Sequence, residues 1–194
     1  MEKELKKSRL YSEELGIKLA GTKKKELFKW FLASILFGKR IPEAIAVKAF
    51  RSFEAESVLS PGKIIETGWD GLVCILDNGS YVRYDFSTAT NLLKTSEKLL
   101  KEYHGDLNEV HEKAKDARNL EEKLMEFHAV GPVTCNIFLR ELRPYWRKAN
   151  PEPLPVVLKI ARKMKINLNK YGRKSLAFAR VEAGLIRLRR KKFK

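Results

Sequence analysis

The amino-acid sequence predicts an all-α protein whose helices are joined by short connections. Three observations lead to this prediction. Apolar residues recur every three or four positions along most of the 194-residue chain, as they do on the buried face of a helix. Residues that begin or end helices stand between these periodic segments. Hydrophobic residues make up 44% of the chain, which is enough to form a sizeable core.

The N-terminal segments predict three helices and one polar break. Residues 2–19 are charged with a thin apolar face, and we expect a single helix that ends at Gly21. Residues 27–36 carry a wide stripe of large apolar side chains, which is typical of a buried helix. The sequence Phe-Gly-Lys-Arg-Ile at residues 37–41 interrupts that helix, and Pro42 begins the third one.

The next segments predict further helices and contain one ambiguous turn. Ser60 caps a short helix that closes near Gly68, and residues 87–103 form a longer helix. Between them, Asp-Asn-Gly-Ser at residues 77–80 is a strong signal for a turn between two β-strands. We favour a turn between helices, because the neighbouring segments are helical and a single β-hairpin is only marginally stable.

The C-terminal segments predict an extended crossover followed by two helices. Residues 150–155, Asn-Pro-Glu-Pro-Leu-Pro, form a stiff connection. Residues 156–164 have the periodicity of an amphipathic helix, residues 168–173 form a turn, and residues 174–192 form a long basic helix. The whole chain is therefore predicted to fold as a helical bundle.

The segment from Asn119 to Leu142 predicts two helices joined by a tight link at residues 127–135. Asn119 can cap the first helix, Gly131 allows the link to adopt a positive φ, and Pro132 suits the first position of the second helix. If the link faces outward, its free N–H groups and those of the second helix converge on one point, which suits an anion such as phosphate. A helical hairpin without a ligand is the alternative.

The net charge of the chain points to a polyanionic partner. Forty Lys and Arg residues stand against 24 Asp and Glu residues, which gives a formal net charge of +16. Nucleic acid is the simplest partner for such a charge, with an anionic membrane surface or the ribosome as rivals. No apolar run approaches the roughly 18 residues that a membrane span requires, and the charged N-terminus does not resemble a signal peptide. We therefore expect a cytoplasmic, nucleoid-associated protein without a membrane partner.

The cysteines and histidines do not predict a metal centre. Cys74 and Cys135 lie in apolar surroundings, and we expect both to be buried, reduced thiols. His104 and His111 could share a helix face, but the sequence offers no third ligand near them, so we expect them at the surface. Two cysteines cannot supply the four thiolates of an iron–sulfur cluster.

The order of the predicted elements resembles the helix-hairpin-helix (HhH-GPD) superfamily of DNA glycosylases, which includes endonuclease III. The resemblance covers about residues 27–188. The family signature has the form Leu-Pro-Gly-Val-Gly-x-x-Thr-Ala, and residues 127–135 read Phe-His-Ala-Val-Gly-Pro-Val-Thr-Cys. The Val-Gly pair and the threonine match. Ala129 stands in place of the first glycine, and Cys135 in place of the alanine.

This resemblance implies one unit of two helical lobes, with DNA in the cleft between them. Residues of about 40–145 would form the lobe that bears the hairpin, and residues 1–39 with 146–194 the second lobe. The hairpin N–H groups would hold a DNA phosphate, and hairpin carbonyls could hold a monovalent cation. The break after the first apolar helix, which in the family fills the gap left by a flipped base, offers Lys39 and Arg40.

The chain departs from the family at the positions that carry its chemistry. Val133 occupies the position of the catalytic lysine, and Val157 the position that we assign to the catalytic aspartate. Valine can act neither as a nucleophile nor as a base. No cluster-bearing loop is present, so we expect no iron–sulfur cofactor. Glu152 and Lys159 are the substitutes that the sequence offers, although a surface charge is the simpler interpretation of each. Glu141 is more simply interpreted as a surface charge or a helix cap.

The sequence therefore predicts a DNA-binding protein related to base-excision-repair glycosylases, without their standard chemistry. The alternatives are an active glycosylase or AP lyase with an unusual catalytic residue, and a module that binds structured RNA. Duplex DNA, damaged or intact, is the preferred partner, and the sequence carries no signal for an oligomeric state. The predicted binding residues are Lys39, Arg40, Ala129, Val130, Gly131, Pro132, Val133, Thr134, Arg140 and Arg143.

Overall fold

The computed structural model describes residues 2–192, and within them every regular element is a helix. The prediction of an all-α fold is confirmed. The helices follow one another in the order α1 (Glu2–Lys6), α2 (Tyr11–Glu14), α3 (Lys24–Phe37), α4 (Glu43–Ala55), α5 (Pro61–Asn78), α6 (Asp85–Tyr103), α7 (Leu107–Lys113), α8 (Ala117–Met125), α9 (Pro132–Leu142), α10 (Pro155–Lys163), the 3-10 helix η1 (Leu168–Lys170) and α11 (Leu176–Lys192).

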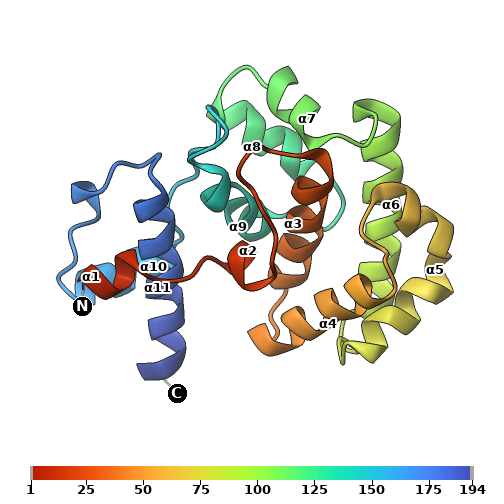
Figure 1. Cartoon of the computed structure of the whole chain (residues 1–194), viewed down its shortest axis with the longest axis horizontal. Helices are drawn as coiled ribbons and strands as arrows, with labels where there is room; N and C mark the ends of the chain where they lie inside the picture. Colours follow the sequence, from red (N-terminus) through yellow and green to blue (C-terminus); the bar gives the residue numbers. More distant parts are fainter. Residues whose placement is uncertain (1, 193–194) are drawn as a thin grey trace.

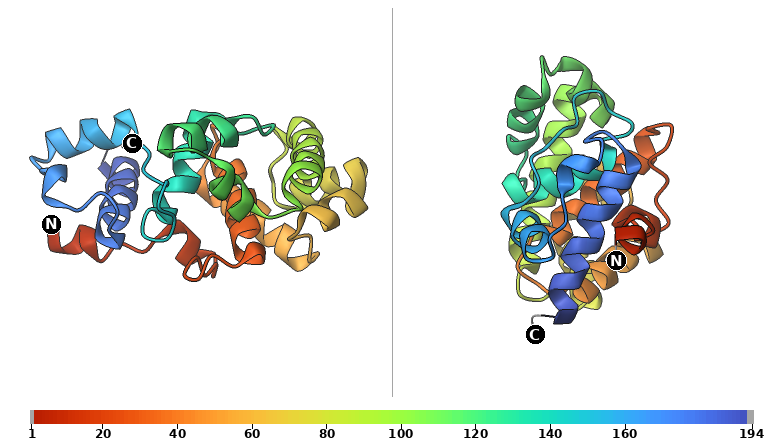
Figure 2. Two further views of the ribbon diagram at one scale, coloured as in Figure 1. Left: turned by 90° about the horizontal axis from the view of Figure 1, so that it is seen from above. Right: turned by 90° about the vertical axis from the view of Figure 1, so that its left-hand side faces the viewer.

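The helices are arranged along the long axis of the molecule (Figure 1). Helices α1, α10 and α11 gather at one end, and α5 packs against α6 at the other end. Helices α3 and α9 pack together in the middle, and α4 connects α3 to α5. The view from above in Figure 2 shows the same order along the axis. The hairpin between α8 and α9 therefore lies in the middle of the molecule.

The buried apolar side chains form two separate clusters. The larger cluster extends from Leu10 to Ala183 in sequence and includes residues of both α3 and α9. The smaller cluster joins Leu5 of α1 to buried residues of α10 and α11. The sequence prediction placed residues 27–36 with the C-terminal helices, whereas the structure packs them in the larger cluster beside α9.

The predicted single helix over residues 2–19 is wrong, and the two clusters explain why. The segment forms two short helices, α1 and α2, with an irregular link between them. Leu5 packs in the smaller cluster, while Leu10 and Leu15 pack in the larger one. A straight helix cannot deliver these side chains to both cores, so the chain bends between them.

The ambiguous turn at residues 77–80 joins two helices, as predicted. Helix α5 ends at Asn78 and α6 begins at Asp85. A Cβ on Gly79 would lie 2.4 Å from the Cα of Ala49 in α4, so the glycine serves a close approach between helices. The predicted helix end near Gly68 is confirmed, because Gly68 has a non-helical φ of 69° and divides α5 into two helical segments.

Helix α9, which follows the hairpin link, is deeply buried. Every residue from Thr134 to Leu142 is buried. The indole N–H of Trp30 in α3 donates to the carbonyl of Phe138 at 3.0 Å, which ties the two central helices together. Because α9 is fixed along its whole length, its first turn presents the hairpin on a rigid support.

Glu141 of α9 is not the surface charge that we considered, because it is fully buried and caps α2. Its two carboxylate oxygens accept the backbone N–H groups of Tyr11 and Ser12, each at 3.0 Å. These contacts satisfy N–H groups that a four-residue helix leaves without partners. Burial raises the pKa of the Glu141 carboxyl, and Arg140 together with these hydrogen bonds opposes that shift.

Cys74 is also placed differently from the prediction. Cys135 is buried as expected, but Cys74 is exposed on α5. Burial raises the pKa of the Cys135 thiol to about 12. The neutral thiol of Cys135 is therefore part of the core at neutral pH.

Candidate nucleic-acid interface

The hairpin joins α8 to α9 through a short link at residues 126–131. Asp116, not Asn119, caps α8, because its side chain accepts the backbone N–H of Asn119 at 2.8 Å. The helix therefore begins at Ala117, two residues before the predicted cap. Helix α9 begins at Pro132 as predicted, with Gly131 as its N-cap.

The positive φ of the hairpin lies at Ala129 and not at Gly131, which corrects the prediction. Ala129 has φ 67°, whereas Gly131 is extended with φ −92°. Two threonines hold this backbone. The Thr95 hydroxyl donates to the carbonyl of His128 at 2.7 Å, and the Thr134 hydroxyl donates to that of Ala129 at 3.4 Å. Ala129 stands where the family signature has its first glycine, so the conformation that suits glycine is retained without the glycine.

The start of α9 presents backbone donors that are free to bind an anion. The first hydrogen bond of the helix runs from the N–H of Cys135 to the carbonyl of Gly131 at 2.9 Å. The described residues provide no acceptor for the N–H groups of Gly131, Val133 and Thr134. Gly131, Pro132 and Val133 are exposed. These N–H groups at the positive end of an 11-residue helix form a site that suits phosphate.

Gly38 holds the turn after α3 directly against the hairpin. A Cβ at this position would lie 2.1 Å from the Thr134 hydroxyl oxygen, so only glycine permits the approach. The turn and the hairpin together enclose an open hollow of about 440 Å³. Its lining comprises Gly38, Lys39, Phe127, Ala129, Val130, Gly131, Pro132, Val133 and Thr134.

The hollow thus brings together most of the residues predicted to bind nucleic acid. Lys39 lines it, and its ammonium group lies 5.8 Å from the centre of the Tyr84 ring. Arg40 is exposed but does not line the hollow. A lysine and residues with free backbone N–H groups therefore line the same hollow, and these are groups that suit a phosphate.

A second cleft of about 330 Å³ adjoins the hollow, because Val133 lines both. The cleft lies between α9, the start of α10 and α11, and most of its lining is apolar, with Phe37 and Ile137 as examples. Among the described lining residues, the charged ones are Glu43 and Arg140. A ligand held at the hairpin can therefore extend into a mainly apolar space beside this carboxylate and this guanidinium.

Arg140 of α9 and Arg143, which directly follows this helix, are not surface groups, which corrects their predicted role. Arg143 is 1% exposed and forms an ion pair of 3.0 Å with Glu182 of α11, so its guanidinium cannot reach DNA. Burial raises the pKa of the Glu182 carboxyl, and Arg143 opposes that shift. Arg140 is 3% exposed and lies inside the cleft. Helix periodicity alone cannot distinguish a basic surface from a buried position next to a cavity.

The substitute catalytic residues lie outside the cleft. The side chain of Glu152 is 84% exposed and pairs with Arg173 at 2.9 Å, and this hydrogen bond lowers the pKa of Glu152. Lys159 is exposed on α10 and is not part of the lining. Val157 is buried in the smaller cluster, and its neighbour Val156 lines the cleft instead. The position that we assigned to the aspartate therefore does not line the cleft, and the neighbouring residue that does is also a valine.

Glu43 is the cleft residue that the sequence analysis missed. It is half-buried in the first turn of α4, directly after the polar break and Pro42. The signal was a carboxylate that follows the predicted DNA-contacting turn by three residues. Whether Glu43 can line the cleft depends on the distance between α4 and α9, and no local sequence pattern predicts that distance.

The hairpin carbonyls fit a monovalent cation only in part. The carbonyls of Phe127, His128, Ala129 and Gly131 each accept a hydrogen bond from the protein. A cation would have to share these oxygens through their second lone pairs. Among the described side chains, no group of three or more His, Cys, Asp or Glu residues is placed to hold a metal ion.

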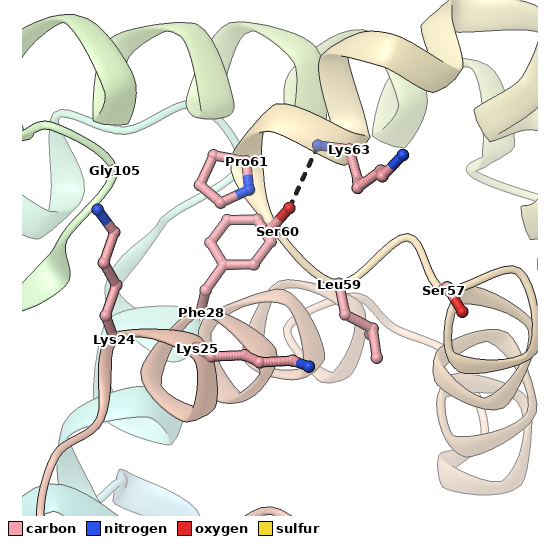
Figure 3. A pocket seen from close by; sticks show the side chains of 9 residues that line it. All are labelled: Lys24, Lys25, Phe28, Ser57, Leu59, Ser60, Pro61, Lys63 and Gly105. Atoms are coloured by element: carbon pink, nitrogen blue, oxygen red, sulfur yellow. Dashed lines mark hydrogen bonds between the residues drawn. The ribbon is translucent and has the colours of Figure 1, made fainter.

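A larger cavity of about 500 Å³ lies at the opposite end of α3 (Figure 3). Lys24, Lys25 and Lys63 extend around an apolar floor that includes Phe28. Lys24 donates to the carbonyl of His104 at 2.6 Å, and Lys63 pairs with Glu66 at 2.8 Å. The N-terminus of α5 also borders this lysine-rich cavity, where the Ser60 side chain accepts the backbone N–H of Lys63 at 3.3 Å. The cavity lies far from the hairpin and provides a comparison site.

Similarity to known proteins adds nothing to the description of this site. The chain matches no protein-family model, no curated protein and no solved structure. In the part of the chain that the structure describes, no helix has the length and apolar character needed to cross a membrane. The resemblance to DNA glycosylases therefore rests on the hairpin residues and on the order of the helices.

Proposed function

We propose that this protein binds duplex DNA through the hairpin between α8 and α9, and that it has a two-lobed fold of the DNA-glycosylase type. The observation that carries the proposal is the hollow lined by Lys39 and by Gly131, Val133 and Thr134, whose backbone N–H groups are free. A phosphate in the hollow would accept hydrogen bonds from the N–H groups and an ionic contact from the lysine.

The charge of the chain supports this proposal at longer range. A net charge of +16 attracts a polyanion before any specific contact forms. The hairpin would then fix the position of the protein on the phosphate backbone without reading the sequence, since phosphate contacts carry no sequence information directly. Binding would weaken as salt rises, because each neutralised phosphate releases counterions.

The chemistry of the cleft supports binding without bond cleavage. Val133 and Val156 line the cleft near the positions where related enzymes carry their catalytic residues. Neither side chain can accept a proton or attack a sugar. A DNA-binding protein that recognises damage without removing it is therefore the function that these residues favour.

Base removal is the second candidate, and Glu43 is the observation that favours it. Glu43 is the carboxylate among the described residues that line the cleft. It could take a proton from a water molecule that attacks the sugar carbon, and the base would leave with the electron pair of the glycosidic bond. Replacement of Glu43 by Gln would abolish this activity and leave DNA binding intact.

The test is a panel of duplexes that contain uracil, 8-oxoguanine, an alkylated purine or an abasic site, scored for binding and for strand cleavage. Gly131→Asp is the decisive variant. A Cβ on Gly131 meets nothing within 4 Å, and aspartate is a good N-cap, so this variant should fold normally. Its carboxylate would occupy the free N–H groups and repel phosphate.

Gly131→Ala is the matched control, because it adds a Cβ but leaves the N–H groups open. We expect the wild type and the alanine variant to bind the duplexes without cleavage, and the aspartate variant to lose binding. Cleavage that Glu43→Gln abolishes would establish the second candidate instead. Preference for structured RNA over duplex DNA at equal salt would favour the RNA-binding alternative, and equal binding by all three forms would overturn the role of the hairpin.

A further inference from the structure

Arg140 is a buried cation whose hydrogen-bonding capacity the protein does not use. It is 3% exposed, and its Nε is a buried atom without a hydrogen-bond partner. The described residues provide no acceptor for its guanidinium and no carboxylate within ion-pair distance. A guanidinium has five N–H donors, and each buried donor without a partner is costly. Such a group in a cleft is a strong indication of a ligand.

The nearby carboxylates balance the charge of Arg140 but not its hydrogen bonds. Arg140 acts electrostatically on Glu141 and Glu182. Glu141 accepts the backbone N–H groups of Tyr11 and Ser12, and Glu182 accepts two hydrogen bonds from Arg143. The donors of Arg140 therefore stay available to a ligand with its own acceptors.

The walls of the cleft favour a small ligand with an apolar body. The centre of the Arg140 guanidinium lies 5.1 Å from the centre of the Tyr11 ring. Ile137 and Val156 contribute apolar surface. A volume of about 330 Å³ is at the lower end of the range for pockets that hold small ligands. A planar ring with two adjacent acceptors on one edge would fill this space and satisfy the arginine.

The position of the cleft identifies the molecule to which such a ring belongs. Val133 lines both the cleft and the hollow at the hairpin. A nucleotide whose phosphate contacts the hairpin would thus have an apolar cleft beside it. The ring that a nucleotide carries is its base, and a base can leave the stack most easily where it is unpaired.

We propose that the cleft receives an unpaired guanine and that Arg140 reads its O6 and N7 atoms. This inference rests on the proposed binding of DNA at the hairpin. Arginine pairs with two acceptors at once through its planar fork, and O6 and N7 of guanine are the pair that it contacts most often. Adenine presents an amino donor beside N7, which repels the guanidinium, and pyrimidines lack a pair of adjacent acceptors on that edge.

The test measures the affinity of the protein for duplexes that carry one nucleotide opposite an abasic site. The nucleotide is guanine, adenine, cytosine, thymine, inosine or 7-deazaguanine. We expect guanine and inosine to bind about 5- to 150-fold more tightly than the others, which is the discrimination of one bidentate pair. Inosine keeps O6 and N7, whereas 7-deazaguanine lacks N7 and should lose the advantage.

Two variants assign the preference to Arg140. Arg140→Met keeps the size of the side chain but removes a cation that opposes the effect of burial on Glu141 and Glu182, so its stability is measured first. Arg140→Lys keeps the charge without the fork. Both should bind all duplexes with the affinity that the wild type shows for adenine. If the methionine variant does not fold, the lysine variant alone decides the result.

The outcomes separate this inference from the function on which it rests. Loss of all binding in Gly131→Asp, together with a guanine preference that both Arg140 variants lose, would support the inference. Wild-type binding that depends on the hairpin but is equal for all six bases would overturn the inference and leave the proposed function intact. A guanine preference that survives in the Arg140 variants would also overturn it. Absence of any DNA binding would overturn the proposed function first.

Discussion

Ala129 is the residue whose backbone conformation is least suited to its side chain. Its φ of 67° lies in the left-handed region, where an L-residue with a Cβ is less stable than glycine. Hydrogen bonds from Thr95 and Thr134 to neighbouring carbonyls hold this conformation. The hairpin therefore keeps its shape because α6 and α9 support it.

Replacement of Ala129 by Gly should stabilise the protein by about 0.5 to 1 kcal/mol, because relief of the left-handed strain exceeds the added entropy of the unfolded chain. Urea unfolding measures the change. Ala44→Gly, at an exposed position in α4, is the control and should destabilise the protein instead. A loss of stability in both variants would contradict the assigned conformation of the hairpin.

His111 is a half-buried imidazole that must remain neutral. Its ring stacks on Trp146 with 4.8 Å between the centroids, and its Nε2 accepts the backbone N–H of Lys148 at 3.3 Å. Burial lowers the pKa of His111, and the neighbouring cations Lys148, Arg147 and Lys174 lower it further. Protonation of Nε2 would place its N–H against the backbone N–H of Lys148, so that two donors would face each other.

The pH dependence of stability follows from this depressed pKa. Below the ordinary histidine pKa of about 6.5, the unfolded state binds a proton that the folded state does not. Stability should therefore be full above that pH and decline as the pH falls through it. We expect urea unfolding at pH 5.5 and 7.5 to show this decline, and His111→Gln to reduce it. His128→Gln, which removes an exposed imidazole, is the control, and an unchanged decline in His111→Gln would contradict the assignment.

At the scale of elements, the contact between the end of α3 and the start of α9 builds the hollow. Gly38 has φ −68°, which any residue can adopt. Glycine is therefore required at this position only because there is no space for a Cβ. The nearest atoms are the hydroxyl oxygen and Cβ of Thr134. A side chain at residue 38 would separate Lys39 from the hairpin N–H groups.

Gly38→Ala should destabilise the protein by about 1 to 3 kcal/mol through overpacking, and it should weaken DNA binding. Thr134→Ala removes the atom that lies nearest to the added Cβ. In the double variant the destabilisation caused by alanine at residue 38 should be smaller than in the wild-type background. Chemical denaturation of the four proteins gives this difference, and an identical loss in both backgrounds would disprove the close contact.

The elements also show what a sequence can and cannot reveal. The periodicity of α3 and the caps of α5 and α9 are local signals, and the prediction from them is confirmed. The break between α1 and α2 depends on two separate cores, and no local signal marks it. Lys39 and the hairpin residues could be named as candidate binding residues because the resemblance implies a DNA contact for each, whereas the hollow that they share is known from the structure. The cleft could not be predicted. Glu43 and Arg140 line it together only because α4 packs against α3 and α3 packs against α9.

At the scale of the whole molecule, the central claim is that a basic protein uses one particular place to hold DNA. Lys39 lies at the hairpin end of α3, and Lys25 lies near its other end, in the lysine-rich cavity of Figure 3. The 14-residue helix separates these ends by about 21 Å. Replacement of either lysine by Gln lowers the net charge equally, so the two variants distinguish a defined phosphate site from general attraction.

The most direct measurement is the salt dependence of duplex binding for the wild type, Lys39→Gln and Lys25→Gln. The slope of log K against log salt concentration reports the number of neutralised phosphates, at about 0.9 per contact. We predict that Lys39→Gln reduces the magnitude of this slope by about one and weakens binding, while Lys25→Gln keeps the wild-type slope. Equal slopes for the two variants, or a larger reduction in Lys25→Gln, would contradict a phosphate site at the hairpin.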